Sequence, residues 1–148
     1  MNLNNEIVSI VVILIFAISC QPSFHDQYYK KIQSSWRISD FQHKDYSEDK
    51  IIDLREQAGF FLMGLENNNH IYFLKRENRE DVSVRATYEI FKENDSIKMR
   101  IEKSDDKRIE GIYDFYIDTI GERDAAYLLQ VSLDSEKTYL SALKWKDK

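Results

Sequence analysis

Few residues in this chain have the types and spacing that catalysis or metal binding requires. The chain contains three histidines: His25, His43 and His70. They show neither the His-Glu-x-x-His spacing nor the accompanying cysteine pair of a metal site, and the chain has no Gly-x-Ser-x-Gly turn and no glycine-rich phosphate loop. Neighbouring acids such as Asp105 and Asp106 fall in turn-like, solvated segments, whereas a general acid and base need unlike surroundings. We therefore expect no enzyme activity, no metal and no cofactor.

The one cysteine, Cys20, follows an apolar run that spans residues 7–18. This run is shorter than the ~20 apolar residues of a membrane-spanning helix and matches the apolar core of a secretory signal peptide. Its ending, Ala17-Ile18-Ser19-Cys20, resembles the lipobox of bacterial lipoproteins, in which a small residue precedes a cysteine that is acylated and becomes the first residue. The alternative is a buried N-terminal helix with a buried thiol.

The resemblance to bacterial lipoproteins implies a location and a division of the chain. Residues 1–19 are expected to be a signal peptide, residues 20–33 a lipidated N-terminal tether, and residues 34–148 the folded domain. Lipid on Cys20 then anchors the protein to a membrane of the bacterial cell envelope, with the mature domain outside the cytoplasm. The formal net charge is −5 and both signs are interspersed, so no basic stripe indicates a nucleic-acid partner.

Alternation of apolar and polar residues predicts eight strands in the folded domain. We expect them over residues 35–41, 60–66, 70–76, 82–90, 96–103, 109–117, 126–133 and 138–145. The clearest is 82–90, where apolar residues alternate with polar ones. The apolar residues are Val82, Val84, Ala86, Tyr88 and Ile90. In residues 60–74 both sets of alternating residues are apolar, so the pattern does not decide which set points inward. An apolar pattern on both faces suggests a region that is covered on both sides.

Helical and turn signals complete the predicted elements. Ser47 as a cap, an acidic first turn and Gly59 as a stop predict a helix over residues 47–58, which we expect to cover the two-sided apolar region. A second, weaker helix is expected from His25 to Gln33. Gly111, inside a predicted strand, is expected to mark a bulge or bend.

A sheet of eight antiparallel strands leaves unpaired backbone N–H and C=O groups on its two edge strands. Closing the sheet into a barrel pairs these groups with each other. We therefore expect an all-β fold with one or two short helices, built as an eight-stranded antiparallel up-and-down barrel. The segments Ser34-Ser35-Trp36-Arg37-Ile38, Thr87-Tyr88-Glu89-Ile90 and Gly111-Ile112-Tyr113-Asp114-Phe115 resemble the lipocalin-like domains of small bacterial lipoproteins. The resemblance implies a lipocalin-like barrel over residues 34–148.

Aromatic residues are numerous, with nine Tyr, eight Phe and two Trp. One interpretation is that they fill the barrel core, and the other is that some line a cavity for one small apolar ligand. The candidate ligand-binding residues are Trp36, Tyr72, Tyr88, Tyr113, Phe115 and Tyr127.

Two short motifs suggest covalent modification. Asp95-Ser96-Ile97 and Asp118-Thr119-Ile120 resemble the Asp-Ser/Thr-aliphatic motif on which some Gram-negative phyla O-glycosylate exported proteins. The resemblance implies Ser96 and Thr119 as the acceptors, and we expect both at strand ends.

Two functions remain open at this point. The first is a membrane-anchored, non-catalytic binding module that holds a small apolar ligand inside the barrel. The alternative is a protein-interaction lipoprotein, such as an inhibitor, an immunity factor or an envelope-assembly accessory, whose solid barrel presents a surface. An apolar cavity would favour the first function, and an exposed binding surface the second.

Overall fold

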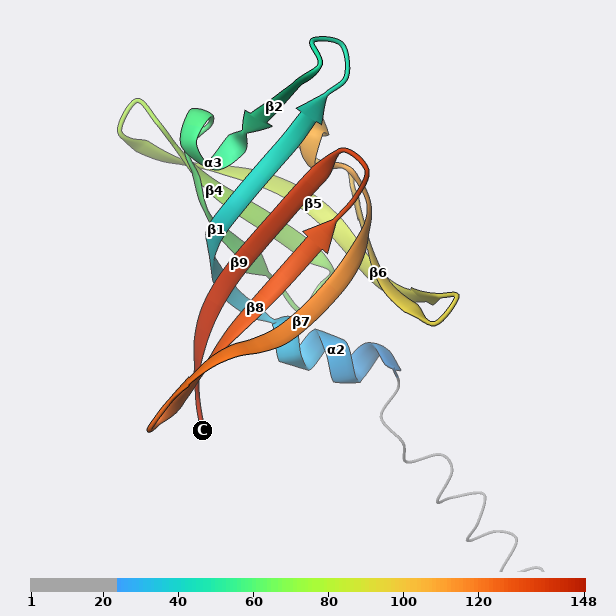
Figure 1. Ribbon diagram of the computed structural model, residues 1–148, viewed down its shortest axis with the longest axis vertical. Helices are drawn as coiled ribbons and strands as arrows, with labels where there is room; N and C mark the ends of the chain where they lie inside the picture. The colour runs from blue at the N-terminus through green and yellow to red at the C-terminus, as the bar shows by residue number, and fades with distance from the viewer. Residues whose placement is uncertain (1–23) are drawn as a thin grey trace, which may run out of the picture. The chain divides into compact units, whose positions relative to one another are not determined.

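The computed structural model describes residues 24–148, which contain one antiparallel sheet of nine strands and two short helices (Figure 1). The chain divides into a unit that ends at Lys31 and a compact unit that runs from Ile32 to Lys148. The predicted signal peptide and Cys20 lie outside the described residues, so their roles stay predictions. The predicted helix near His25 is confirmed as α2, Phe24–Ile32.

The nine strands follow each other closely along the chain. They are β1 Ser34–Asp45, β2 Lys50–Asp53, β3 Phe60–Leu65, β4 His70–Glu77, β5 Glu80–Glu93, β6 Ser96–Glu102, β7 Gly111–Arg123, β8 Ala126–Asp134 and β9 Thr138–Asp147. Neighbours in the sheet run in the order β2-β1-β3-β4-β5-β6-β7-β8-β9, and β1 also pairs with β9. Eight strands therefore form a near-closed ring, and β2 lies outside it. The eight predicted strands are confirmed, and β2 is an addition.

Two-residue turns built from Asn, Asp and Arg join the middle strands. Asn78 and Arg79 connect β4 to β5, Asn94 and Asp95 connect β5 to β6, and all four residues have positive φ. A pair of left-handed residues gives the turn whose twist matches the twist of the flanking strands. Asn and Asp adopt this conformation more readily than most residues, which explains how a chain with four glycines makes tight hairpins.

The predicted alternation marks the inside of the ring correctly. In β5 the residues Val84, Ala86, Tyr88 and Ile90 are at most 4% exposed, while Ser83, for example, is exposed. In residues 60–74 the sequence did not decide which side chains point inward. The structure shows that Met63 and Phe73 lie inside the ring and are fully buried.

The helix predicted over residues 47–58 is wrong. Residues 50–53 form β2 instead, paired with Gln42–Asp45 of β1, and the helix α3 covers only Leu54–Gln57. Asp53, not Ser47, caps α3, because its Oδ1 accepts a hydrogen bond from the backbone N–H of Glu56 at 2.9 Å. The predicted stop at Gly59, φ +76°, is correct.

β7 also differs from its prediction. Gly111 pairs regularly with Ile101, and the bulge in this strand lies between Thr119 and Gly121, so the expected bulge at Gly111 is wrong. The strand continues to Arg123, past the predicted end at residue 117.

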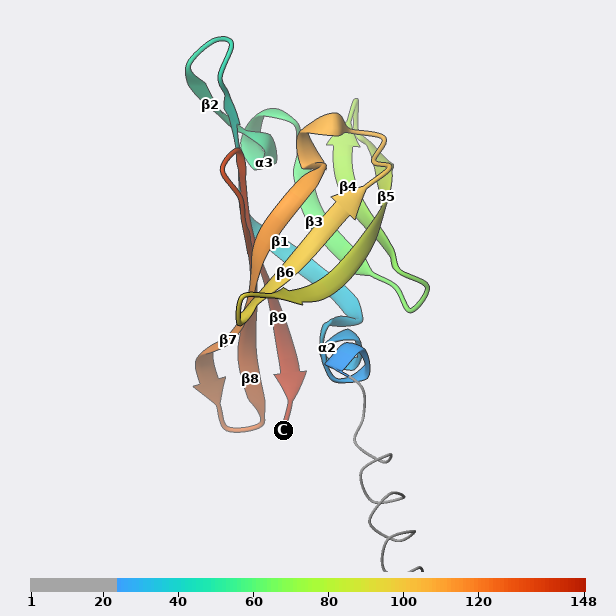
Figure 2. The ribbon, with the colours of Figure 1, turned by 90° about the vertical axis from the view of Figure 1, so that its right-hand side faces the viewer.

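Two hairpins project from opposite ends of the ring (Figures 1 and 2). The β1–β2 hairpin extends from one end, together with α3, the β8–β9 turn and the 3-10 turn η1, Lys107–Ile109. The β7–β8 hairpin and the last residues of β9 extend from the other end. Only residues 111–114 of β7 pair with β6, which is why the second projection stands clear of β6.

The interior of the ring is lined with large apolar side chains. The rings of Phe41, Phe60 and Phe73 form a cluster with centroid separations of 5.2 to 6.3 Å. Leu54 of α3 is fully buried, and α3 contacts β1, β2 and β3. Aromatic clusters of this kind contribute packing energy beyond the buried area alone.

Candidate functional site

Four of the six predicted ligand-binding residues are packed in the core. Trp36, Tyr88, Tyr113 and Phe115 are at most 3% exposed. Trp36 Nε1 donates a hydrogen bond to the carbonyl of Ile32 at 2.8 Å. A buried aromatic residue with a satisfied polar atom is well suited to packing.

The two tyrosines in this set use their hydroxyls in the same way. Tyr88 donates to the carbonyl of Glu66 at 3.1 Å, and Tyr113 donates to the carbonyl of Ile109 at 2.6 Å. Burial raises the pKa of Tyr113, so its phenol is protonated at neutral pH. Among the described residues no buried side-chain polar atom lacks a hydrogen-bond partner. The interior therefore offers no unsatisfied polar group to a ligand.

The other two candidates are not part of this buried core, so the structure does not bring all six together. Tyr127 of β8 is 36% exposed, and the ammonium of Lys148 lies 5.2 Å from its ring centroid. Tyr72 of β4 is half-buried on the outer face, where it lines two surface hollows. Whether any of the six contacts a ligand stays a prediction.

Strand register places Tyr72 in a row of four residues across the outer face. Ser35 of β1 pairs with Gly64 of β3, Gly64 pairs with Tyr72, and Tyr72 pairs with Arg85 of β5. Directly opposite residues in antiparallel strands point to the same face of the sheet. The row therefore holds a hydroxyl, a glycine without a side chain, a phenol ring and a guanidinium.

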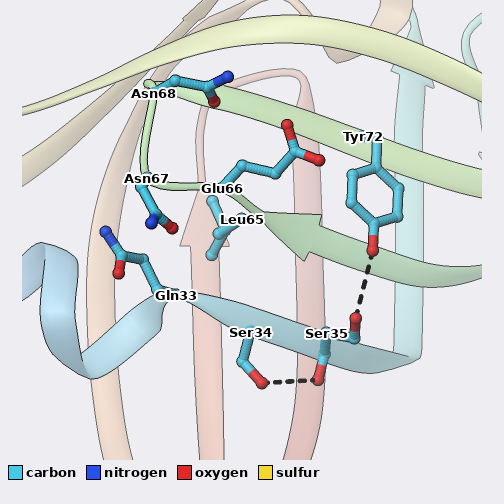
Figure 3. Close-up of a pocket in the computed structure, with 8 residues that line it drawn as sticks. All are labelled: Gln33, Ser34, Ser35, Leu65, Glu66, Asn67, Asn68 and Tyr72. Carbon is cyan, nitrogen blue, oxygen red and sulfur yellow. Dashed lines mark hydrogen bonds between the residues drawn. The ribbon is translucent and has the colours of Figure 1, made fainter.

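Gly64 allows the ring of Tyr72 to lie against β3. A Cβ atom at position 64 would stand 2.0 to 2.4 Å from three atoms of the Tyr72 side chain, which is closer than any real contact. With the glycine in place, the Tyr72 hydroxyl reaches across β3 and shares a hydrogen bond of 3.2 Å with the Ser35 hydroxyl (Figure 3). A glycine inside a strand often marks such a close approach.

A polar hollow of about 780 Å³ opens beside this ring (Figure 3). Its lining residues come from the start of β1, the β3–β4 turn and β4: Gln33, Ser34, Ser35, Leu65, Glu66, Asn67, Asn68 and Tyr72. Side-chain amides and hydroxyls both donate and accept hydrogen bonds, and the Glu66 carboxylate only accepts. The hollow can therefore pair with a ligand that carries donors and acceptors together.

A second hollow of about 510 Å³ shares Glu66, Asn68 and Tyr72 with the first. Its further lining includes His70, Ser83 and Arg85. The Nδ1 atom of His70 lies 2.9 Å from the carbonyl of Asn68, and because a carbonyl only accepts, Nδ1 carries the hydrogen. We name the two hollows and their shared residues the Tyr72 site.

Sequence reasoning identified Tyr72 but missed the residues that hold it. Gly64, Ser35 and the turn residues Glu66, Asn67 and Asn68 did not appear as candidates. A glycine in the middle of an apolar strand was the one local signal for Gly64. The contact between Ser35 and Tyr72 joins strands that are far apart in the sequence, so no local sequence pattern predicts it.

The two predicted glycosylation residues are both exposed. Ser96 begins β6, directly after the Asn94-Asp95 turn, as expected. Thr119 lies inside the longer β7, at the edge of its bulge, so its predicted place at a strand end is wrong. Whether either hydroxyl carries a glycan stays a prediction.

Among residues 24–148 no three His, Cys, Asp or Glu side chains gather where they would share a metal ion. None of the helices in this part of the chain has the length and apolar character of a membrane-crossing segment. Comparison with protein-family models, curated proteins and solved structures gave no match for this chain.

Proposed function

We propose that this protein is an exported, lipid-anchored and non-catalytic module that binds a protein partner at the Tyr72 site. The near-closed ring serves in this proposal as a lipocalin-like, eight-stranded up-and-down barrel with a solid interior. Binding then takes place on the outer face, which corresponds to the second of the two functions that the sequence left open.

The arrangement of Tyr72 is the observation that carries this proposal. Its ring is held over Gly64 and tied to Ser35, so it is oriented before any partner arrives. Tyrosine offers a large, rigid contact area at little conformational cost and is enriched at protein interfaces. The side-chain amides and hydroxyls beside it complement an extended polypeptide, whose backbone carries donors and acceptors in alternation.

The packed interior supports the choice of the outer face. Trp36, Phe73 and Tyr113 are among the largest side chains below 2% exposure, and a small barrel can be filled by its own side chains. An apolar ligand inside the ring, the first of the two functions predicted from the sequence, stays a prediction. An apolar molecule that co-purifies with the protein and raises its melting temperature when resupplied would favour that function instead.

The anchoring part of the proposal rests on the lipobox-like residues that end at Cys20. Replacing Cys20 by Ser should release the domain from the membrane fraction or leave the precursor uncleaved, because each acyl chain contributes ~0.8 kcal/mol per buried CH₂. Cell fractionation and the mass of the mature chain measure both effects. A Cys20→Ser variant that partitions and matures like the wild type would contradict lipid anchoring.

Site-specific photo-cross-linking in the native envelope tests the binding surface. A photoreactive residue in place of Asn68, which lines both hollows, should form a discrete adduct with one protein. The same residue in place of Lys92, which is exposed on β5 and outside both hollows, serves as the matched control. Adducts of equal yield at both positions, or adducts with glycan and no protein, would rule out a protein partner at the Tyr72 site.

A further inference from the structure

A separate hollow of about 460 Å³ lies at the end of the ring that carries the β1–β2 hairpin. Its residues come from the end of β1, from η1 and from the β8–β9 turn: His43, Lys44, Asp45, Tyr46, Ser47, Lys107, Arg108, Glu110, Lys137 and Thr138. None of them lines the Tyr72 site. Four of the ten carry a positive charge: Lys44, Lys107, Arg108 and Lys137.

Two lysines meet at this hollow. The backbone N–H of Lys44 donates to the carbonyl of Lys137 at 2.7 Å, so the two residues are fixed next to each other. Both ammonium groups lie over the ring of Tyr46, at 4.7 Å for Lys44 and 5.9 Å for Lys137. The ring attracts both cations, and this attraction offsets part of their mutual repulsion. We name Lys44, Tyr46 and Lys137 the Tyr46 cluster.

The acidic groups around the hollow accept hydrogen bonds from residues other than Lys44 and Lys137. Each carboxylate has its own donor: Asp45 accepts from Ser47, Asp106 from Arg108, Glu110 from Lys107, and Glu136 from Tyr46. Among the described residues no carboxylate lies within ion-pair distance of Lys44 or Lys137. Lys44 and Lys137 therefore make no direct ion pair, and the nearest acids, Asp45 and Glu136, keep their negative charge while they are held by the neutral hydroxyls of Ser47 and Tyr46.

His43 borders the same hollow, and its hydrogen-bond roles follow from its partners. Thr138 Oγ1 donates to the carbonyl of Arg108 at 3.0 Å, so the same oxygen accepts from His43 Nδ1 at 2.8 Å. Burial and the positive charges of Arg108 and Lys137 lower the pKa of His43, against the opposite influence of two carboxylates, Asp45 and Asp106. The pKa of the His43 imidazole therefore depends on the charge around it, and an anion bound in the hollow would raise this pKa.

We propose that the Tyr46 cluster binds a phosphate group in its dianionic form. Two ammonium groups that make no direct ion pair match the charge of about −2 that a phosphate group reaches near neutral pH. Lysine is a compact, hydrated point charge and suits a tetrahedral oxyanion, whereas Arg108 is already held in two hydrogen bonds by Asp106. This inference does not depend on the Tyr72 site.

Calorimetric titration of the full chain with inorganic phosphate, in an uncharged detergent, tests the proposal. Wild type should show saturable 1:1 binding, and the Lys44→Gln/Lys137→Gln variant should lose at least about tenfold in affinity, because charge-assisted hydrogen bonds are removed. Saturating phosphate should also raise the pKa of His43 in wild type, measured by NMR of its ring protons.

Lys92→Gln/Lys146→Gln is the matched control, since it removes two positive charges from exposed positions outside the hollow. Its affinity for phosphate should equal that of wild type. An equal loss in both variants, an absence of saturable binding in wild type, or an unchanged pKa of His43 at saturation would overturn the proposal. Because all four lysines are exposed, melting curves should confirm that each variant folds.

The phosphate group can come from a free metabolite or from a lipid headgroup, and a second titration separates these sources. Vesicles that contain phosphatidic acid offer a phosphomonoester at a surface, and vesicles of phosphatidylglycerol offer a phosphodiester with a single charge. Binding of phosphatidic acid vesicles that depends on both lysines assigns the lipid source. Binding of inorganic phosphate without binding of either vesicle assigns the free anion.

Discussion

Two neighbouring rows of residues cross the same four strands and have opposite characters. The inner row is Trp36, Met63, Phe73 and Val84, all at most 4% exposed. The outer row is Ser35, Gly64, Tyr72 and Arg85, one residue away in each strand. The inner row is filled by apolar side chains, and the outer row holds one aromatic ring above a glycine.

The two rows place the core and the proposed binding surface on opposite faces of one sheet. Successive side chains of a strand point to opposite faces, so a shift of one residue moves a side chain from the core to solvent. Phe73 contributes through buried area, and Tyr72 through the position of its ring and hydroxyl. Substitutions in the two rows should therefore affect different properties of the protein.

The largest contrast is expected between Phe73→Ala and Tyr72→Ala. Removal of the fully buried Phe73 ring should lower the free energy of unfolding by about 3–5 kcal/mol, because a cavity remains in a packed core. Tyr72→Ala should cost no more than about 1 kcal/mol, as is usual for partly exposed positions. Urea denaturation of both variants measures the difference, and equal losses would contradict the assignment of the two faces.

Gly64→Ala should have an intermediate effect and act through Tyr72. The new methyl group occupies the place of the Tyr72 ring, which must swing away from β3 and leave the Tyr72 site. In the Tyr72→Ala background the same change should be neutral or stabilise by about 0.5–1 kcal/mol, because Ala is better than Gly inside a strand. A double-mutant cycle in urea detects this coupling. Identical effects of Gly64→Ala in both backgrounds would mean that no such contact exists.

Tyr72→Phe should have the smallest effect on stability. It removes only the hydrogen bond to Ser35, and because that bond lies near solvent its loss should cost about 0.5 kcal/mol, the low end of the usual range. Ser35→Ala should cost the same, and the two changes together should cost no more than one alone. Additive losses in the melting temperature would show that the two hydroxyls do not act as a pair.

Local pattern was enough to predict the strands of the ring and its inner face. In β5 and β6 the alternation around Val84, Tyr88 and Met99 gave the buried residues correctly, because a half-buried strand has a period of two. The same approach failed at residues 47–58, where helical spacing suggested a helix. There Ile51 is 65% exposed, and backbone pairing with β1 decided the conformation.

The residues of the candidate sites could be predicted only in part from the sequence. Tyr72 was one of six aromatic candidates, but nothing in the sequence separated it from Trp36 or Tyr113, since all three occupy predicted strands. Composition shows how many aromatic residues exist, and only register shows which of them face outward.

The sequence by itself determined that this chain forms an antiparallel sheet with an apolar inner face, because side-chain alternation and turn-forming residues are local properties. Tertiary structure alone decided that Ser35, Gly64 and Tyr72 form one row, and that Lys44 and Lys137 meet over Tyr46. These contacts depend on the register between strands and on the pairing of β1 with β9. The β3–β4 turn fixes the register of Gly64 and Tyr72 locally, whereas the pairings of β1 with β3 and with β9 join segments that are far apart in the chain, so no single segment of the sequence carries them.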